Sequence, residues 1–212
     1  MAAADDVTVI LIRHAEKLTW HNGVAPSKEM KALYIDNHIL SAKGYERAHA
    51  LVGYFNHREE IQALFRRRPL AAIIAQDVDR TPDAWGRSER PRETVEPLAT
   101  HLAPRGVVFL TYTKKQLPQV LSSIREFKGR TVIVSWAHQQ IPDLTVALGV
   151  PAAQVPQHWP GKRFDVTWVV EPGSGTPATF VQYPQRLLFG DKDSVIDLHS
   201  AKGKEKDDNG DE

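Results

Sequence analysis

Short runs of apolar residues recur along the chain and predict strands. The first run, residues 7–12, is apolar at almost every position and rich in β-branched side chains, which is typical of a strand buried on both faces of a sheet. Five later runs predict further strands, and a Pro-Gly-Ser-Gly turn sequence at 172–175 separates the last two. These strands are expected at residues 70–75, 107–110, 131–135, 164–170 and 179–183.

Between these runs, apolar residues recur at helical spacing. Ser41 is expected to cap the first of these helices, and Ser88 is expected to cap the third, with Pro91 in its first turn. Gly129 and Gly149 are expected to end the last two. The helical apolar patterns run through residues 45–55, 61–65, 95–102, 117–127 and 144–148.

Cationic and imidazole side chains lie at or just beyond the ends of several of these predicted strands. Arg13 and His14 follow the first strand directly, His138 follows the strand 131–135, and Arg90 lies at a helix start beyond the strand 70–75. Open α/β sheets bind ligands at the carboxyl ends of their strands. Arginine offers donors that match phosphate oxygens, and imidazole is a nucleophile near neutral pH. Each residue alone is also typical of a polar strand end, but together they indicate a phosphate-binding site.

Composition mainly excludes certain classes of function. The chain has 212 residues and a net charge of +1, so no overall basic field indicates nucleic acid or a membrane surface, and any attraction for phosphate must be local. It has no cysteine, which excludes disulfides, thiol nucleophiles and cysteine-ligated zinc. We find no signal-peptide pattern and no apolar run of membrane-spanning length, so we expect a cytoplasmic protein. No pattern indicates an oligomeric state.

Three segments together form a spaced motif. They are the strand followed by Arg13-His14, the helix start Arg90-Pro91-Arg92-Glu93-Thr94, and the strand followed by Ala137-His138. This motif resembles the histidine phosphatase superfamily, also called phosphoglycerate mutase-like proteins, and segment 40–48 (LSAKGYERA) resembles the family's LSxxGxxRA helix. The resemblance covers roughly residues 7–170. It implies an α/β fold, specifically a three-layer α/β/α sandwich with a mostly parallel central sheet.

The domain organisation that we expect is simple. Residues 5–199 are expected to form a single histidine-phosphatase-like domain, because neither an internal repeat nor a linker is evident. Residues 200–212 are charged and lack an apolar anchor, so we expect them to be disordered.

The resemblance also implies roles for the motif residues. His14 is the implied nucleophile, which forms a phosphohistidine, while Arg13, Arg90 and His138 bind the phosphate oxygens. The spacing to Thr94 selects Arg90 over Arg92. No metal or other cofactor is implied, because cationic side chains stabilise the transferred group. The implied activity is that of a phosphoric monoester hydrolase acting on a small phosphorylated molecule.

The general acid is absent from both of the family's usual positions. Residues 103–118 contain no carboxylate, and Gln139 follows His138 where acid phosphatase members have Asp. We nominate Glu16 because it is closest to the nucleophile in sequence. The remaining candidates are Asp36, Asp77, Asp79 and Glu89.

This absence leaves three hypotheses open. The leaving group has a low pKa, as in a phosphoanhydride; or the acid comes from the loop 19–40; or the pocket serves another purpose. In the last case the protein binds an anionic ligand without turnover, or performs a step of small-molecule biosynthesis.

Further residues are expected to contact the substrate. Lys17 and Trp20 begin the long polar stretch that runs to Leu40, which we expect to fold over the sheet edge. Lys162 and Arg163 are expected to add cationic reach toward a second phosphate or a carboxylate. Several aromatic residues are compatible with an apolar substrate, but packing is the favoured interpretation. They are Trp20, Tyr34, Trp85, Trp136 and Trp159.

Overall fold

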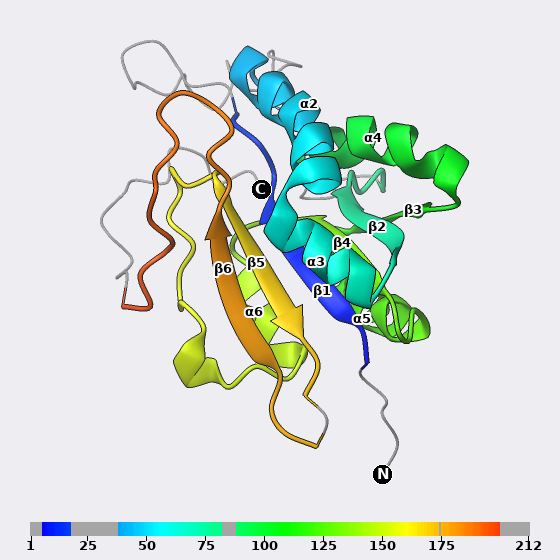
Figure 1. The fold of residues 1–212 in the computed structure, drawn as a ribbon. Coiled ribbons are helices and arrows are strands. Elements are labelled where there is room, and N and C mark those ends of the chain that lie inside the picture. Colours follow the sequence, from blue (N-terminus) through cyan, green and yellow to red (C-terminus); the bar gives the residue numbers. More distant parts are fainter. Residues whose placement is uncertain (1–5, 18–37, 82–87, 174, 200–212) are drawn as a thin grey trace.

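The computed structural model describes residues 6–17, 38–81, 88–173 and 175–199 (Figure 1). Most of the long polar stretch (residues 18–37) and the predicted disordered tail (200–212) lie outside the described residues. None of the helices in the described part of the chain combines the length and apolar character needed to cross a membrane.

The described strands form one six-stranded sheet in the order β3-β2-β4-β1-β5-β6. The four strands β3, β2, β4 and β1 are mutually parallel, while β5 runs antiparallel to both β1 and β6. The predicted α/β class with a mostly parallel sheet is thus confirmed. The strands are β1 (Thr8–Arg13), β2 (Leu70–Asp77), β3 (Val108–Thr113), β4 (Thr131–Trp136), β5 (Val166–Glu171) and β6 (Thr179–Pro184).

Five α-helices occur among the described residues. The Ser41 side chain accepts a hydrogen bond from the Gly44 N–H at 3.1 Å, so its predicted capping role is confirmed. Ser88 does not cap, because the residue before the third of these helices is Glu89, which makes no capping bond. The helices are α2 (Ala42–His57), α3 (Glu59–Arg67), α4 (Arg90–Leu102), α5 (Leu117–Glu126) and α6 (Ile141–Ala147), with short 3-10 helices η3 (Ala103–Arg105), η4 (Lys114–Gln116) and η5 (Ala152–Gln154).

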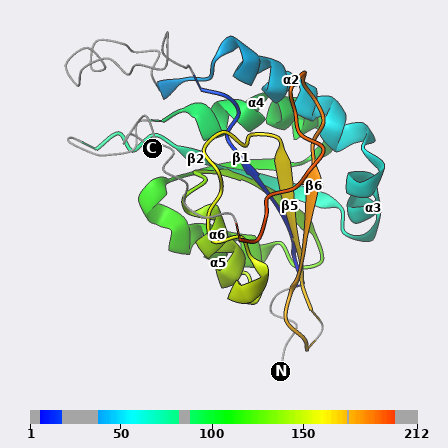
Figure 2. The ribbon, with the colours of Figure 1, turned by 90° about the vertical axis from the view of Figure 1, so that its left-hand side faces the viewer.

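Helices cover both faces of the sheet (Figure 2). On one face, Ile10 and Ile12 of β1 share an apolar core with α2, α3 and α4. On the other face, Val9 and Leu11 share a second core with α5 and α6. Successive residues of a strand point to opposite faces, so a strand between two cores needs apolar residues on both faces, as residues 9–12 of β1 provide.

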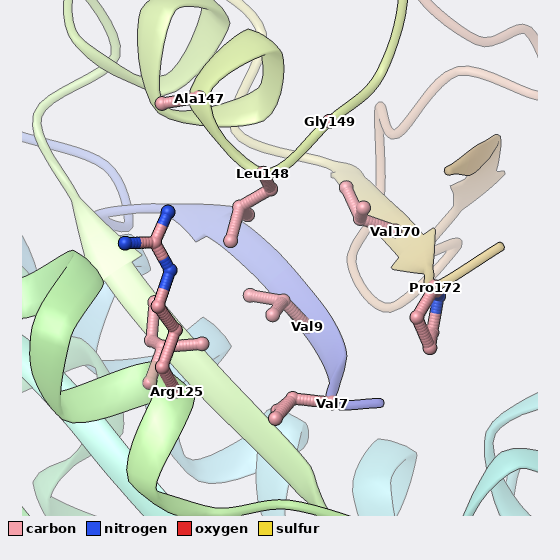
Figure 3. Close-up of a pocket in the computed structure, with 9 residues that line it drawn as sticks. Val7, Val9, Arg125, Ala147, Leu148, Gly149, Val170 and Pro172 are labelled. Carbon is pink, nitrogen blue, oxygen red and sulfur yellow. The ribbon is translucent and has the colours of Figure 1, made fainter. Parts of the chain in front are cut away.

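The two ends of the parallel strands differ in character. Their carboxyl ends carry Arg13 and the other polar residues of the motif, whereas the amino end of β1 borders a cavity of about 80 Å³ lined by Val7, Val9 and Leu148 (Figure 3). This small apolar cavity lies at the edge opposite to Arg13. It is therefore separate from the candidate site.

Candidate functional site

Arg13 ends β1 and is buried, at 2% exposure. Its Nη1 donates hydrogen bonds to the carbonyl oxygens of Pro160 and Gly161 at 3.2 and 2.7 Å. Its Cζ lies 4.2 Å from the ring centroid of Phe164, a cation–π contact. The loop 160–164 is therefore fixed against the end of β1, and the direction of the guanidinium is set by this loop.

His14 follows directly and is 1% exposed. Its Nδ1 lies 2.6 Å from the carbonyl oxygen of Ala15. Because a carbonyl oxygen only accepts, Nδ1 carries the hydrogen, and the lone pair of the neutral ring is on Nε2. The imidazole also contacts the ring of Phe164, with 5.7 Å between centroids. Nε2 is thus the atom of His14 that has nucleophilic character.

Thr94 connects the end of β1 to the start of α4. Its buried hydroxyl accepts from the Ala15 N–H at 2.8 Å and donates to the Arg90 carbonyl oxygen at 2.7 Å. Arg90 is the first residue of α4 and is 3% exposed, and its Nε donates to the Ser88 hydroxyl at 3.1 Å. The structure therefore brings Arg90 to the strand end that carries His14.

Arg92, the alternative to Arg90, has a different environment. It is partly exposed and lies within ion-pair distance of Glu89 (3.0 Å), Glu96 (3.2 Å) and Asp77 (3.4 Å). Arg92 is thus surrounded by carboxylates from the start of α4 and the end of β2, whereas Arg90 is buried.

His138 lies two residues beyond β4, which is the parallel neighbour of β1. The register of these two strands pairs Arg13 with Trp136, so His138 leaves the sheet beside the end of β1. The intervening Ala137 N–H donates to Gln76 Oε1 at 3.2 Å, which ties this turn to the end of β2. His138 is 3% exposed. All four residues predicted to form the phosphate pocket thus lie buried at one edge of the sheet.

Glu16, nominated as the general acid, anchors α2 instead. Its two carboxylate oxygens accept from Arg47 Nε and Nη2 at 2.9 and 2.8 Å. Its carbonyl oxygen accepts from the Ser41 N–H and hydroxyl at 2.9 and 3.0 Å. The Glu16 carboxylate thus makes a bidentate, charge-assisted contact with the Arg47 guanidinium. Because this carboxylate is bound to α2, its contacts do not support the predicted role of Glu16 as the acid.

The same arginine binds a second carboxylate. Arg47 is 2% exposed and donates to both carboxylate oxygens of Asp191, at 3.0 and 2.5 Å. Burial opposes ionisation of Asp191, but the hydrogen bonds from Arg47 and from the N–H groups of Leu188 and Leu187 outweigh it and lower the pKa of Asp191. Burial likewise opposes the charge of Arg47, yet the bonds to both carboxylates raise the pKa of Arg47. Arg47, Glu16 and Asp191 form one hydrogen-bonded network.

The other described acid candidates also have cationic or hydrogen-bonding neighbours. Asp77 and Glu89 lie against Arg92, as described above. The hydroxyl and N–H of Thr81 lower the pKa of Asp79, and Lys115 Nζ lies 3.2 Å from that carboxylate. All three carboxylates therefore have neighbours of their own at this edge of the sheet.

Of the other predicted substrate contacts, Lys17 is described and Trp20 is not. The backbone of Lys17 pairs with Leu40 in an isolated antiparallel bridge, and Trp20, like the acid candidate Asp36, is outside the described residues. Tyr34 and Trp85 are also outside them. The two described tryptophans of that set, Trp136 and Trp159, are fully buried, as the packing interpretation predicts.

Lys162 and Arg163 are neighbours in the chain but have different environments. Lys162 is exposed, between residues whose carbonyl oxygens bind Arg13. Arg163 is buried, and its guanidinium donates to Asp165 at 2.7 Å and to the Ser194 carbonyl oxygen at 2.5 Å. Arg163 therefore holds the C-terminal segment in place, and its contacts do not support the predicted part in substrate binding.

Phe164 lies at the candidate site, although the sequence predicts that it belongs to a strand. The apolar pattern puts it at the start of a strand, but β5 begins at Val166, and the Phe164 ring packs against Arg13 and His14. The sequence analysis also misses Gln76, although a polar residue near the end of an otherwise apolar strand is a usable signal.

Comparison of the sequence with models of known families gave no match, and no similar curated protein was found. The function is therefore argued from the geometry of the site and from the motif it contains.

Proposed function

We propose that this protein is a metal-independent phosphatase that hydrolyses a small phosphate ester or phosphoanhydride through a phosphohistidine on His14. The observation that carries the proposal is the Nδ1 hydrogen bond to Ala15, which leaves the lone pair of the neutral ring on Nε2 at the sheet edge that also carries buried Arg13, Arg90 and His138. We also propose that the fold is the phosphoglycerate mutase-like three-layer sandwich. Its support is the pair of apolar cores on opposite faces of the sheet.

The proposed reaction has two steps. In the first, the Nε2 lone pair forms a bond to phosphorus while the bond to the leaving oxygen breaks, and that oxygen departs with the electron pair. In the second, water attacks the same phosphorus and gives a proton to bulk water, the N–P bond returns its electrons to Nε2, and inorganic phosphate leaves. Arg13, Arg90 and His138 stabilise the charge on the equatorial oxygens in both steps.

A second candidate function is binding of an anionic ligand, or other chemistry in the same pocket. The observation that favours it is that the four described acid candidates all contact cations or hydrogen-bond donors. An enzyme without a general acid is limited to leaving groups of low pKa. A substrate panel tests this limit, because equal turnover of alkyl phosphates and anhydrides would exclude it.

The decisive experiment is hydrolysis of p-nitrophenyl phosphate in excess EDTA. We expect activity in the native protein, because this leaving group needs little protonation, and a loss of about a thousandfold or more in His14→Ala. The matched control is His49→Ala, which changes an exposed histidine of α2 and should leave turnover unchanged. Phosphate binding without turnover in the native protein would favour the binding function and exclude the phosphatase.

A further inference from the structure

A second cavity, of about 190 Å³, is lined by residues that lie next to the candidate phosphate site. Phe164 lines it, and the ring of the same residue contacts both Arg13 and His14. Glu16, two residues beyond His14, also lines it. A single water molecule takes up about 30 Å³ in the liquid. The cavity is several times larger, so a tetrahedral oxyanion fits into it.

Three lysines make the lining of this cavity cationic. Lys43, Lys162 and Lys192 all line it and all are exposed, so their ammonium groups meet solvent at its mouth. They come from α2, from the loop that holds Arg13, and from the C-terminal segment. Lys43 is directed by a hydrogen bond of 3.2 Å to the Phe189 carbonyl oxygen and lies 4.0 Å from Glu16. We call this cavity, with its three lysines, the lysine pocket.

The other charges of the lysine pocket largely balance one another. Arg47 binds Glu16 and Asp191, and Arg163 binds Asp165. Two arginines thus face three carboxylates, and the three lysines bring the lining to five cations against three anions, a surplus of two positive charges. This surplus matches the charge of a phosphate group near neutral pH.

We propose that the lysine pocket binds a second oxyanion, a phosphate or a carboxylate, of the same molecule whose first phosphate lies at His14. This inference rests on the proposed function and specifies its substrate class: a phosphorylated molecule with a second anionic group. Relative to the sequence-based expectation, Lys43 and Lys192 replace Arg163, whose guanidinium is already bound to Asp165 and Ser194. An ammonium group on a flexible stem suits such a point contact with an oxyanion.

The test uses phosphonates, because their C–P bond resists hydrolysis and binding is then separate from turnover. Alkane-α,ω-bisphosphonates with two to six methylene groups are compared with the alkylphosphonate of equal length, by isothermal titration calorimetry on the full chain. The length series allows for a range of separations between the two sites. An ω-phosphonocarboxylate series distinguishes the two sources of the second anion, because the tighter-binding series identifies the group that the pocket accepts.

We expect the best bisphosphonate to bind about tenfold more tightly than its alkylphosphonate, since each exposed lysine contact contributes a fraction of that factor. In the combined variant Lys43→Met, Lys162→Met and Lys192→Met, this ratio should fall close to one. The matched control is Lys128→Met, an exposed lysine after α5 at the opposite edge of the sheet, which should keep the ratio. Because the readout is a ratio, a general loss of affinity cancels.

Two results would overturn the inference: a ratio near one at every length in the native protein, or an unchanged ratio in the triple variant. The second binding site and the proposed phosphatase activity can fail these tests independently of one another. Hydrolysis of p-nitrophenyl phosphate with a ratio near one removes only the second site. A tenfold ratio without hydrolysis supports the second site and removes only the phosphatase.

Discussion

At the scale of single residues, Thr94 connects two elements of the candidate site, although it is not one of the predicted pocket residues. One hydroxyl group links the residue after His14 to the carbonyl oxygen of Arg90. We expect Thr94→Val to lower the free energy of unfolding by about 1–3 kcal/mol, because the buried Ala15 N–H loses its acceptor while the side-chain volume is kept. It should also lower kcat/KM for p-nitrophenyl phosphate, because Arg90 is no longer tied to the strand end.

Two further variants isolate the hydroxyl at this position. Thr94→Ser keeps the hydroxyl group and should retain most of the stability and activity. Thr100→Val changes an exposed threonine of the same helix and should leave both nearly unchanged. Urea unfolding and steady-state kinetics measure the effects. If Thr94→Val matched Thr100→Val in both measurements, the link between β1 and α4 would not matter for the site.

At the scale of elements, the amino-terminal half of α2 is built onto Glu16. Ser41 donates to its carbonyl oxygen, Arg47 binds its carboxylate, and Gly44 approaches the same carbonyl so closely that a Cβ would lie 2.3 Å from it. Ser41, Gly44 and Arg47 of segment 40–48 therefore dock this helix onto Glu16, two positions after His14.

Gly44→Ala tests this docking. Alanine normally favours a helix over glycine by about 1 kcal/mol, yet here we expect a destabilisation of about 1–3 kcal/mol, because the added methyl group would displace the Glu16 backbone. Gly53→Ala is the matched control in the same helix. Apart from its chain neighbours and the nearby backbone of its own helix, no atom of the described residues lies within 4 Å of the added Cβ, so this variant should gain about 0.5–1 kcal/mol. Thermal and urea unfolding report both changes, and a stabilised Gly44→Ala would contradict the close approach.

The elements are largely predictable from the sequence, and the roles of particular side chains are not. Residues 7–12 predict a buried strand because their apolar pattern is local, and β1 covers Thr8–Arg13. Phe164 is apolar and continues the following strand pattern, so no local signal indicates that its ring packs on Arg13 instead. The nomination of Glu16 rests on its closeness to His14 in sequence, whereas its carboxylate is held by Arg47, 31 positions away.

At the scale of the whole molecule, the C-terminal segment completes the domain by contacts with distant elements. Asp191 binds Arg47 of α2, the Ser194 carbonyl oxygen binds Arg163, and Ile196 is buried in the core beneath α5 and α6. No sequence pattern predicts this closure, because each contact joins groups that are far apart in the chain. The segment also carries Lys192 of the lysine pocket.

Two truncations test whether the domain ends where the sequence predicts. Ending the chain after His199 removes none of these contacts, so the urea midpoint should stay unchanged. Ending it after Gln185 removes Asp191 and Ile196, which leaves Arg47 without one carboxylate and opens the core, so we expect at least about 4 kcal/mol less stability. Equal midpoints for the two truncations would show that residues 186–199 are dispensable. A lower midpoint for the first truncation would extend the domain beyond residue 199.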